Sequence, residues 1–297
     1  MSTIRSLSVG NGDMFYIKHG SDNFTMIDCC MDDGAEKRLV ELLQFESKGV
    51  GITRFISTHP DDDHIRGLAY LHKKMDLLNF YCITNQATKP DDTDDFDQYC
   101  ALRDDQKKAF YLYKGCQRKW MNLNDTERGS SGLNVLWPIT SNSDYQDALR
   151  EAANGECPNN ISIILKYALN NGVTALWMGD LESNFMDKIV DEITLPSVDI
   201  LFAPHHGRTT GSVPTKWLEQ MSPQIIVIGE APAEHLNYYQ GYNAITQNSA
   251  WDITFECRTG KVDVFVSNDE YSVDFLEDEN LLSNDYGTYI GTLSTRS

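Results

Sequence analysis

The sequence predicts a mixed α/β (α+β) domain, folded as a four-layer αβ/βα sandwich in which two sheets face each other between layers of helices. Two observations lead to this prediction. Near the start, short strand-like runs are separated by the turn sequences GNGD and HGSDN, as expected for antiparallel neighbours. Strand and helix patterns then alternate, and this arrangement occurs twice. We therefore expect residues 1–297 to form a single domain, with a site at one edge between the sheets.

The first half of the chain predicts one sheet and its helices. Turns separate three runs rich in β-branched and aromatic residues, and an amphipathic helix and a buried strand follow. A second helix and strand complete this half. In order, we expect strands at 4–9, 14–18 and 24–28, a helix at 35–43, a strand at 52–57, a helix at 64–75 and a strand at 80–84.

Residues 85–132 depart from this alternation and are predicted to be an inserted helical arm or lid. The segment begins with the acidic run Asp91–Asp97 and then becomes basic and aromatic, without an acidic residue between Gln106 and Asn124. One interpretation is an amphipathic helical insertion with a solvated basic face. The alternative is a substrate-contacting arm whose cations meet phosphates. Those cations are Lys107, Lys108, Lys114, Arg118 and Lys119.

The second half predicts the other sheet, followed by an acidic extension. Residues 268–297 belong to a stretch that is rich in acids and lacks Lys and Arg up to Thr295. They are expected to form either an acidic edge element or a partly mobile tail. The elements predicted before them are strands at 133–137, 161–167 and 174–178, a helix at 185–193, a strand at 198–202, a helix at 215–221, a strand at 224–228 and paired strands at 253–258 and 261–266.

The composition limits the functional classes. With 44 acidic and 25 basic side chains, the chain has a formal net charge of −19, which disfavours general electrostatic binding to nucleic acid or to anionic membranes. We find no signal peptide in residues 1–30 and no apolar run of about eighteen residues, so no membrane segment is expected. Seven cysteines without a C-x-x-C pair suggest reduced thiols and a cytoplasmic location.

Metal-capable side chains directly follow three of the predicted buried strands. Loops at strand ends are where folded scaffolds place reactive groups. The spacing in the first of these clusters suits two cations roughly 3.5–4 Å apart. Helix capping would explain one aspartate, but not two histidines and three aspartates within six residues. The three clusters are His59-Pro60-Asp61-Asp62-Asp63-His64, Gly179-Asp180 and His205-His206.

These motifs resemble the metallo-β-lactamase fold superfamily of hydrolases, and within it the ComEC-type branch. The superfamily's H-x-H-x-D-H signature is similar to residues 59–64, with Asp61 at the second histidine position. The similarity runs from about residue 4 to 267, apart from the insertion. The branch includes the hydrolase domain of a competence DNA-uptake channel and stand-alone soluble enzymes. The other matching motifs are Val9-Gly10-x-Gly12-Asp13, Ile27-Asp28, Met178-Gly179-Asp180-Leu181-Glu182 and Pro204-His205-His206-Gly207.

The resemblance implies a binuclear centre with two divalent cations. His59 and Asp61 would bind one metal, Asp63 and His64 the other, and Asp180 would bridge both. One histidine of the 205–206 pair would complete the second site or contact the leaving group. We expect His205 to be the ligand and His206 the catalytic residue.

Two further residues are weaker candidates. Asn160 lies in a segment that resembles the N-x-S strand start of the ComEC-type branch, where it would be a ligand or a substrate contact; a turn residue is an equally good interpretation. Members of the branch often have a histidine after the strand that follows the His205-His206 motif. His235 is the nearest histidine here and is the candidate substitute for it.

The predicted donor set favours hydrolysis. Three carboxylates with two or three imidazoles make Mn²⁺ a competitor to Zn²⁺. The metals would lower the pKa of a bound water, and Asp63 would orient the resulting nucleophile. A phosphodiester is the first substrate prediction, for a nuclease or nucleotide phosphodiesterase acting on a small or single-stranded substrate.

Two alternatives stay open. One is a carboxylic ester, lactone or amide hydrolase. The other is a metal-poor binding or regulatory partner with the same fold. It is suggested by Asp61 in place of a histidine, and by residues 158–162, which lack the histidine that other superfamily members have at this position. A protein partner or homo-oligomer is open in either case.

Overall fold

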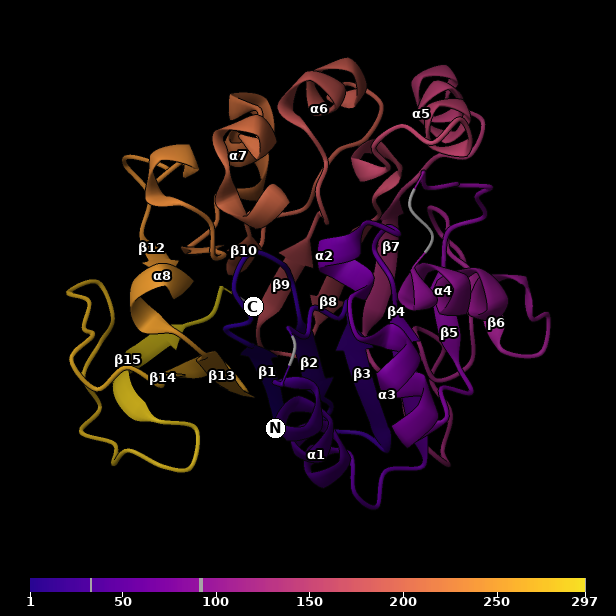
Figure 1. The fold of residues 1–297 in the computed structure, drawn as a ribbon. Helices are drawn as coiled ribbons and strands as arrows, with labels where there is room; N and C mark the ends of the chain where they lie inside the picture. The colour runs from indigo at the N-terminus through magenta and orange to yellow at the C-terminus, as the bar shows by residue number, and fades with distance from the viewer. Residues whose placement is uncertain (33, 91–92, 297) are drawn as a thin grey trace.

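The computed structural model describes residues 1–32, 34–90 and 93–296, and it confirms the predicted αβ/βα fold class (Figure 1). Two mixed sheets face each other through an apolar core, and helices cover their outer faces. Phe15 lies in this core, where its ring centroid is 5.1 Å from that of Phe202 and 6.2 Å from that of Trp177 in the opposite sheet. Such aromatic pairs each add about 0.5–1.5 kcal/mol to the stabilisation from area burial.

The first sheet has the strand order β15-β14-β13-β1-β2-β3-β4-β5-β6. Pairing is antiparallel from β15 to β3 and parallel from β3 to β6. Helices α1, α3 and α4 bury their apolar side chains against its outer face. The elements are β1 (Ser2–Ser6), β2 (Phe15–Lys18), β3 (Asn23–Ile27), α1 (Glu36–Glu46), β4 (Ile52–Ile56), α3 (Leu68–Met75), β5 (Phe80–Cys82), α4 (Asp94–Asp104), β6 (Ala109–Tyr111), β13 (Ile253–Arg258), β14 (Lys261–Val266) and β15 (Thr288–Ser294).

The second sheet has the strand order β12-β11-β10-β9-β8-β7. Its strands are parallel from β12 to β9 and antiparallel from β9 to β7. Helices lie on the face away from the first sheet (Figure 1). The elements are β7 (Leu133–Trp137), α5 (Ser143–Ala153), β8 (Ile164–Ala168), β9 (Thr174–Trp177), α6 (Ser183–Ile189), β10 (Ile200–Phe202), α7 (Thr215–Met221), β11 (Ile225–Ile228), β12 (Ala244–Thr246) and α8 (Gln247–Ala250).

The helix predicted at 64–75 is interrupted, and this break shapes the site. A short helix, α2 (Asp62–Ile65), ends before Gly67, whose φ of +86° is left-handed. The loop after β3 competes for the helix carbonyls, because the backbone N–H groups of Cys29 and Met31 donate to the oxygens of His64 and Arg66. The chain therefore restarts as α3.

The segment 85–132 differs in detail from the helical arm expected for it. Its helix, α4, carries the acidic residues, whereas the basic stretch forms the edge strand β6 and the turns after it. Lys108 pairs with Asp76, Lys119 pairs with Asp125, and Arg118 lies 4.7 Å from the ring centroid of Phe110. These contacts engage three of the five cations within the protein. Asp91 and Asp92 lie outside the described residues.

The end of the chain forms an edge element up to Arg296. Strand β15 pairs with β14, and Glu279 pairs with Arg258 and Lys261 on the neighbouring strands. Ser297 lies outside the described residues. In the part of the chain that the structure covers, we find no helix with the length and apolar composition needed to cross a membrane.

Candidate metal centre

Acidic and histidine side chains from both sheets meet at one end of the sandwich. Helix α2 follows β4 of the first sheet, and the loop before β2 approaches it. Asp180 follows β9, and the single turn η2 (His205–Gly207) follows β10. The carboxyl ends of strands in both sheets thus supply the site, as the sequence motifs predict.

Four buried residues converge most closely. One ligand atom from each of Asp13, His64, Asp180 and His206 lies within 4.8 Å of the others. His64 Nε2 is 3.0 Å from Asp180 Oδ1, and His206 Nε2 is 3.4 Å from Asp180 Oδ2. Asp63 Oδ2 borders the group, 3.1 Å from His206 Nε2. The arrangement combines imidazole and carboxylate donors that suit a divalent transition metal.

The outer nitrogen of His64 is held by a carboxylate. Nδ1 of His64 is 2.8 Å from Asp28 Oδ2, and Asp28 itself accepts hydrogen bonds from the backbone N–H (2.7 Å) and hydroxyl (2.6 Å) of Thr58. Asp28 adopts a left-handed conformation with φ of +55°, which turns its side chain at the end of β3. In metal sites, such a carboxylate orients the imidazole and leaves Nε2 for the ion.

His206 has an equivalent carboxylate partner. Its Nδ1 is 3.1 Å from Asp13 Oδ1, and the backbone N–H of Asp13 donates to the carbonyl of Asp63 (3.1 Å). Close approach of this loop requires Gly12, because a Cβ there would lie 2.6 Å from the same carbonyl oxygen. His206 has φ of +55°, which folds the η2 turn so that its ring is buried.

Several buried polar atoms of the centre lack hydrogen-bond partners in the described part of the chain and suit a cation. His59 is fully buried, and its Nδ1 lies 3.1 Å from Thr58 Oγ1. Among the described residues, His59 Nε2, His64 Nε2 and Asp180 Oδ1 are buried without a hydrogen-bond partner of good geometry. Leaving such groups unsatisfied costs about 1–3 kcal/mol each. A metal ion would satisfy His64 Nε2 and Asp180 Oδ1, so the residues present fit the group.

The electrostatics of the centre favour a cation. Burial alone would lower the pKa of His206, but the carboxylates of Asp180 and Asp13 raise it to about 10. Burial also acts to lower the pKa of His64, but Asp180 and Asp28 raise this pKa well above its usual value. The surrounding carboxylates therefore stabilise positive charge at both imidazoles. A metal ion would take the place of the protons.

Other sequence candidates lie around this centre. His205 is partly exposed, with Nε2 3.8 Å from Asp180 Oδ2 and Nδ1 3.0 Å from Thr210 Oγ1. Asp61 caps α2 and forms an ion pair with Lys89 (3.0 Å). The side-chain amide of Asn160 donates a hydrogen bond to Glu182 Oε2 and accepts one from the backbone N–H of Glu182. His235 lies in the exposed turn η4 (Ala233–His235), and the structure does not bring it into the buried group.

Asp13 and Asp28 are the site residues that the sequence reasoning missed. Both lie in the Gly12-Asp13 and Ile27-Asp28 motifs, which marked them as part of the resemblance but gave them no role. Their partners, His206 and His64, are distant along the chain. Only the fold shows that each carboxylate holds one imidazole.

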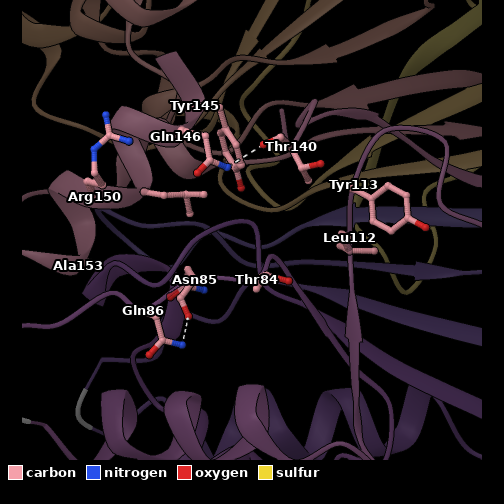
Figure 2. A pocket seen from close by; sticks show the side chains of 11 residues that line it. Thr84, Asn85, Gln86, Leu112, Tyr113, Thr140, Tyr145, Gln146, Arg150 and Ala153 are labelled. Atoms are coloured by element: carbon pink, nitrogen blue, oxygen red, sulfur yellow. Dashed lines mark hydrogen bonds between the residues drawn. The ribbon is translucent and has the colours of Figure 1, made fainter. Parts of the chain in front are cut away.

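A cavity of about 520 Å³ opens in another part of the fold (Figure 2). It lies between the segment after β5, the turn after β6 and helix α5, and Figure 2 shows Asn85 and Gln86 on one side and Tyr145, Gln146 and Arg150 on the other. The described residues that line it include no member of the Asp13–His64–Asp180–His206 group. The cavity is therefore distinct from the candidate metal centre.

Replacing either supporting carboxylate is expected to weaken metal binding. Asp28→Asn and Asp13→Asn should each lower the affinity for Zn²⁺ or Mn²⁺ by about 10–100-fold, because the amide no longer orients and polarises the imidazole. Competition with a chromophoric chelator measures this affinity. Asp187→Asn on the exposed surface of α6 is the control and should leave it unchanged. Wild-type affinity in both variants would contradict the supporting role.

Comparisons with known proteins add little. No protein-family model matches the chain, and no curated protein does. Among solved structures, this chain is similar to a long form of RNase Z from yeast, at 11% sequence identity and a TM-score of 0.41. The alignment covers 82% of this chain and 40% of the RNase Z chain. The chain thus spans less than half the length of that protein. What is established for this chain is its αβ/βα fold and a buried His/Asp group that fits a metal ion.

Proposed function

We propose that this chain is a metal-dependent hydrolase of the metallo-β-lactamase type, acting on a phosphodiester. The observation that carries the proposal is the pair of imidazoles, His64 and His206, whose Nδ1 atoms are held by carboxylates while their Nε2 atoms face Asp180. This arrangement is typical of metal ligands. A purely structural cluster has no need of it.

The residues divide into ligands and groups that act on the substrate. Asp63, His64, Asp180 and His206 would hold the cation, with His206 rather than His205 as the histidine ligand, because His206 is the one in the buried group. A divalent cation there lowers the pKa of a coordinated water and polarises the reacting ester. Asp63 also remains partly exposed, so its carboxylate can accept a hydrogen bond from the attacking water.

His205 is suited to contact the leaving group. Burial lowers its pKa below the ordinary value, so the ring is neutral at neutral pH. The hydroxyl of Thr210 can donate to Nδ1, which places the ring proton on Nε2. From the rim of the centre, this N–H would donate a hydrogen bond to a leaving oxygen and stabilise its developing charge.

Arg208 supports a phosphodiester over an uncharged ester. It lies two residues after His206, is half-buried, and donates one hydrogen bond to Asn11 Oδ1 (2.5 Å). Its Nε is buried without a partner among the described residues. A half-buried guanidinium close in sequence to His206 suits a phosphate oxygen. The chain's charge of −19 favours a small or single-stranded substrate over duplex DNA.

Activity on matched reporters tests the proposed reaction. We expect the Mn²⁺- or Zn²⁺-loaded protein to hydrolyse bis-p-nitrophenyl phosphate and a short single-stranded oligonucleotide, and to leave p-nitrophenyl acetate and a chromogenic β-lactam intact. Arg208→Met should raise KM for the phosphodiester by about 10–100-fold, since a lost charged hydrogen bond costs about 1.5–3 kcal/mol. Cleavage of only the ester or lactam would overturn the phosphodiester assignment. An inert protein without bound metal would favour a binding role.

A further inference from the structure

We propose that this centre binds one divalent cation rather than two, and that the ammonium of Lys89 holds Asp61, the carboxylate expected to bind the second ion. The inference rests on the proposed metal-dependent function and refines it. Two metals are expected from the sequence, with His59 and Asp61 binding one of them. In the structure, however, Asp61 is already paired with Lys89.

The Lys89–Asp61 contact is built into the fold. Lys89 Nζ lies 3.0 Å from Asp61 Oδ1 and 2.5 Å from Asp62 Oδ1, and the lysine side chain is only 11% exposed. The ring centroid of Phe96 lies 5.7 Å from the ammonium, close enough for a cation–π contact. Partial burial strengthens an ion pair relative to one on the open surface.

The backbone around Lys89 is also fixed. The N–H of Thr88 donates to the carbonyl of Ala152 (3.0 Å), and its hydroxyl donates to the carbonyl of Ala153 (3.1 Å). These bonds tie the segment before Lys89 to the end of α5. The lysine therefore reaches Asp61 from an anchored position, and Asp61 is at the same time the N-cap of α2.

The predicted ligands that remain on that side are too few for a second ion. Asn160 donates to Glu182 Oε2 (2.9 Å) and accepts from the Glu182 N–H (3.1 Å), so its amide is already engaged. Of the predicted ligands, only His59 Nε2 and the shared Asp180 are then left. Catalytic zinc sites use about three protein ligands, and Mn²⁺ usually takes more.

The other side has a full donor set. Asp63, His64, Asp180 and His206 contribute contacts of 3.0–3.9 Å among their ligand atoms. One cation there and one ammonium beside Asp61 would supply positive charge to both halves of the centre. Lys89 thus has a positioning role, since it acts on the centre by holding Asp61.

Metal stoichiometry tests the inference without relying on activity. Chelator-treated protein is loaded with excess Mn²⁺ and desalted, and its metal content is measured by plasma mass spectrometry beside its electron paramagnetic resonance spectrum. We expect one Mn²⁺ per chain with a six-line mononuclear signal, unchanged in Asp61→Asn. Lys89→Met should free Asp61 and raise the content to two, with a spin-coupled signal. Lys188→Met, an exposed lysine of α6, should stay at one.

The outcomes separate the two proposals. Two ions in the wild type, falling to one in Asp61→Asn, would overturn the single-cation inference and leave the metal-dependent function standing. A content of one in Lys89→Met would overturn the role of Lys89. No bound ion in correctly folded wild type, as judged by circular dichroism, would overturn the proposed function itself.

Discussion

Replacing Asp180 with alanine is expected to remove the bound cation and to lower kcat/KM for a phosphodiester by at least about 10³-fold. Asp180 is 2% exposed, and its two oxygens lie 3.0 Å from His64 Nε2 and 3.4 Å from His206 Nε2. Asp63 also lies near both imidazoles, 3.9 Å from His64 Nε2 and 3.1 Å from His206 Nε2, but it is more exposed than Asp180. Without Asp180, the two rings lose the buried carboxylate that they share.

Metal content and steady-state kinetics of the same preparation measure this effect. Asp187→Ala removes a surface carboxylate seven residues further along the chain and should retain wild-type values for both. If Asp180→Ala kept its cation and its rate, the catalytic centre would have to be sought elsewhere in the molecule.

Replacing Arg54 with methionine is expected to lower the free energy of unfolding by about 3–5 kcal/mol. The guanidinium is 1% exposed and donates to Asn23 Oδ1 (2.7 Å), Thr25 Oγ1 (3.1 Å) and the carbonyl of Trp120 (3.0 Å), as well as to the hydroxyl of Ser131. These bonds join β3 and β4 to the end of the segment 85–132. Methionine would fill the space but leave the buried acceptors unpaired.

Urea denaturation monitored by tryptophan fluorescence measures the loss of stability. Arg38→Met, on the exposed face of α1, is the matched control and should change the free energy of unfolding by less than about 0.5 kcal/mol. A loss below about 1 kcal/mol in Arg54→Met would show that the buried network does not anchor the segment.

The strands that carry the centre were predictable because their signals are local. The runs before His59, Asp180 and His205 are rich in apolar residues, and each ends in a polar turn. In the structure β4, β9 and β10 end before these turns. Helix α5 went unpredicted, because its buried face consists of Tyr145 and small alanines rather than large apolar residues.

The finer features of the centre depend on tertiary contacts. Lys89 meets Asp61 across 28 positions, and Asp13 meets His206 across 193, so no local pattern reveals either pair. Which of the two histidines enters the centre depends on the η2 turn, where both have left-handed backbone conformations. This turn buries the ring of His206 and leaves the ring of His205 at the rim. The spacing of residues in the sequence does not predict that turn.

The most direct measurement is the rate of phosphodiester hydrolysis by wild-type protein as cation is removed and restored. We expect a chelator to abolish the rate and added Mn²⁺ or Zn²⁺ to restore it, with the Asp180→Ala protein inactive throughout. A rate that is unaffected by chelation, or equal in wild type and Asp180→Ala, would contradict a metal-dependent hydrolase built on Asp63, His64, Asp180 and His206.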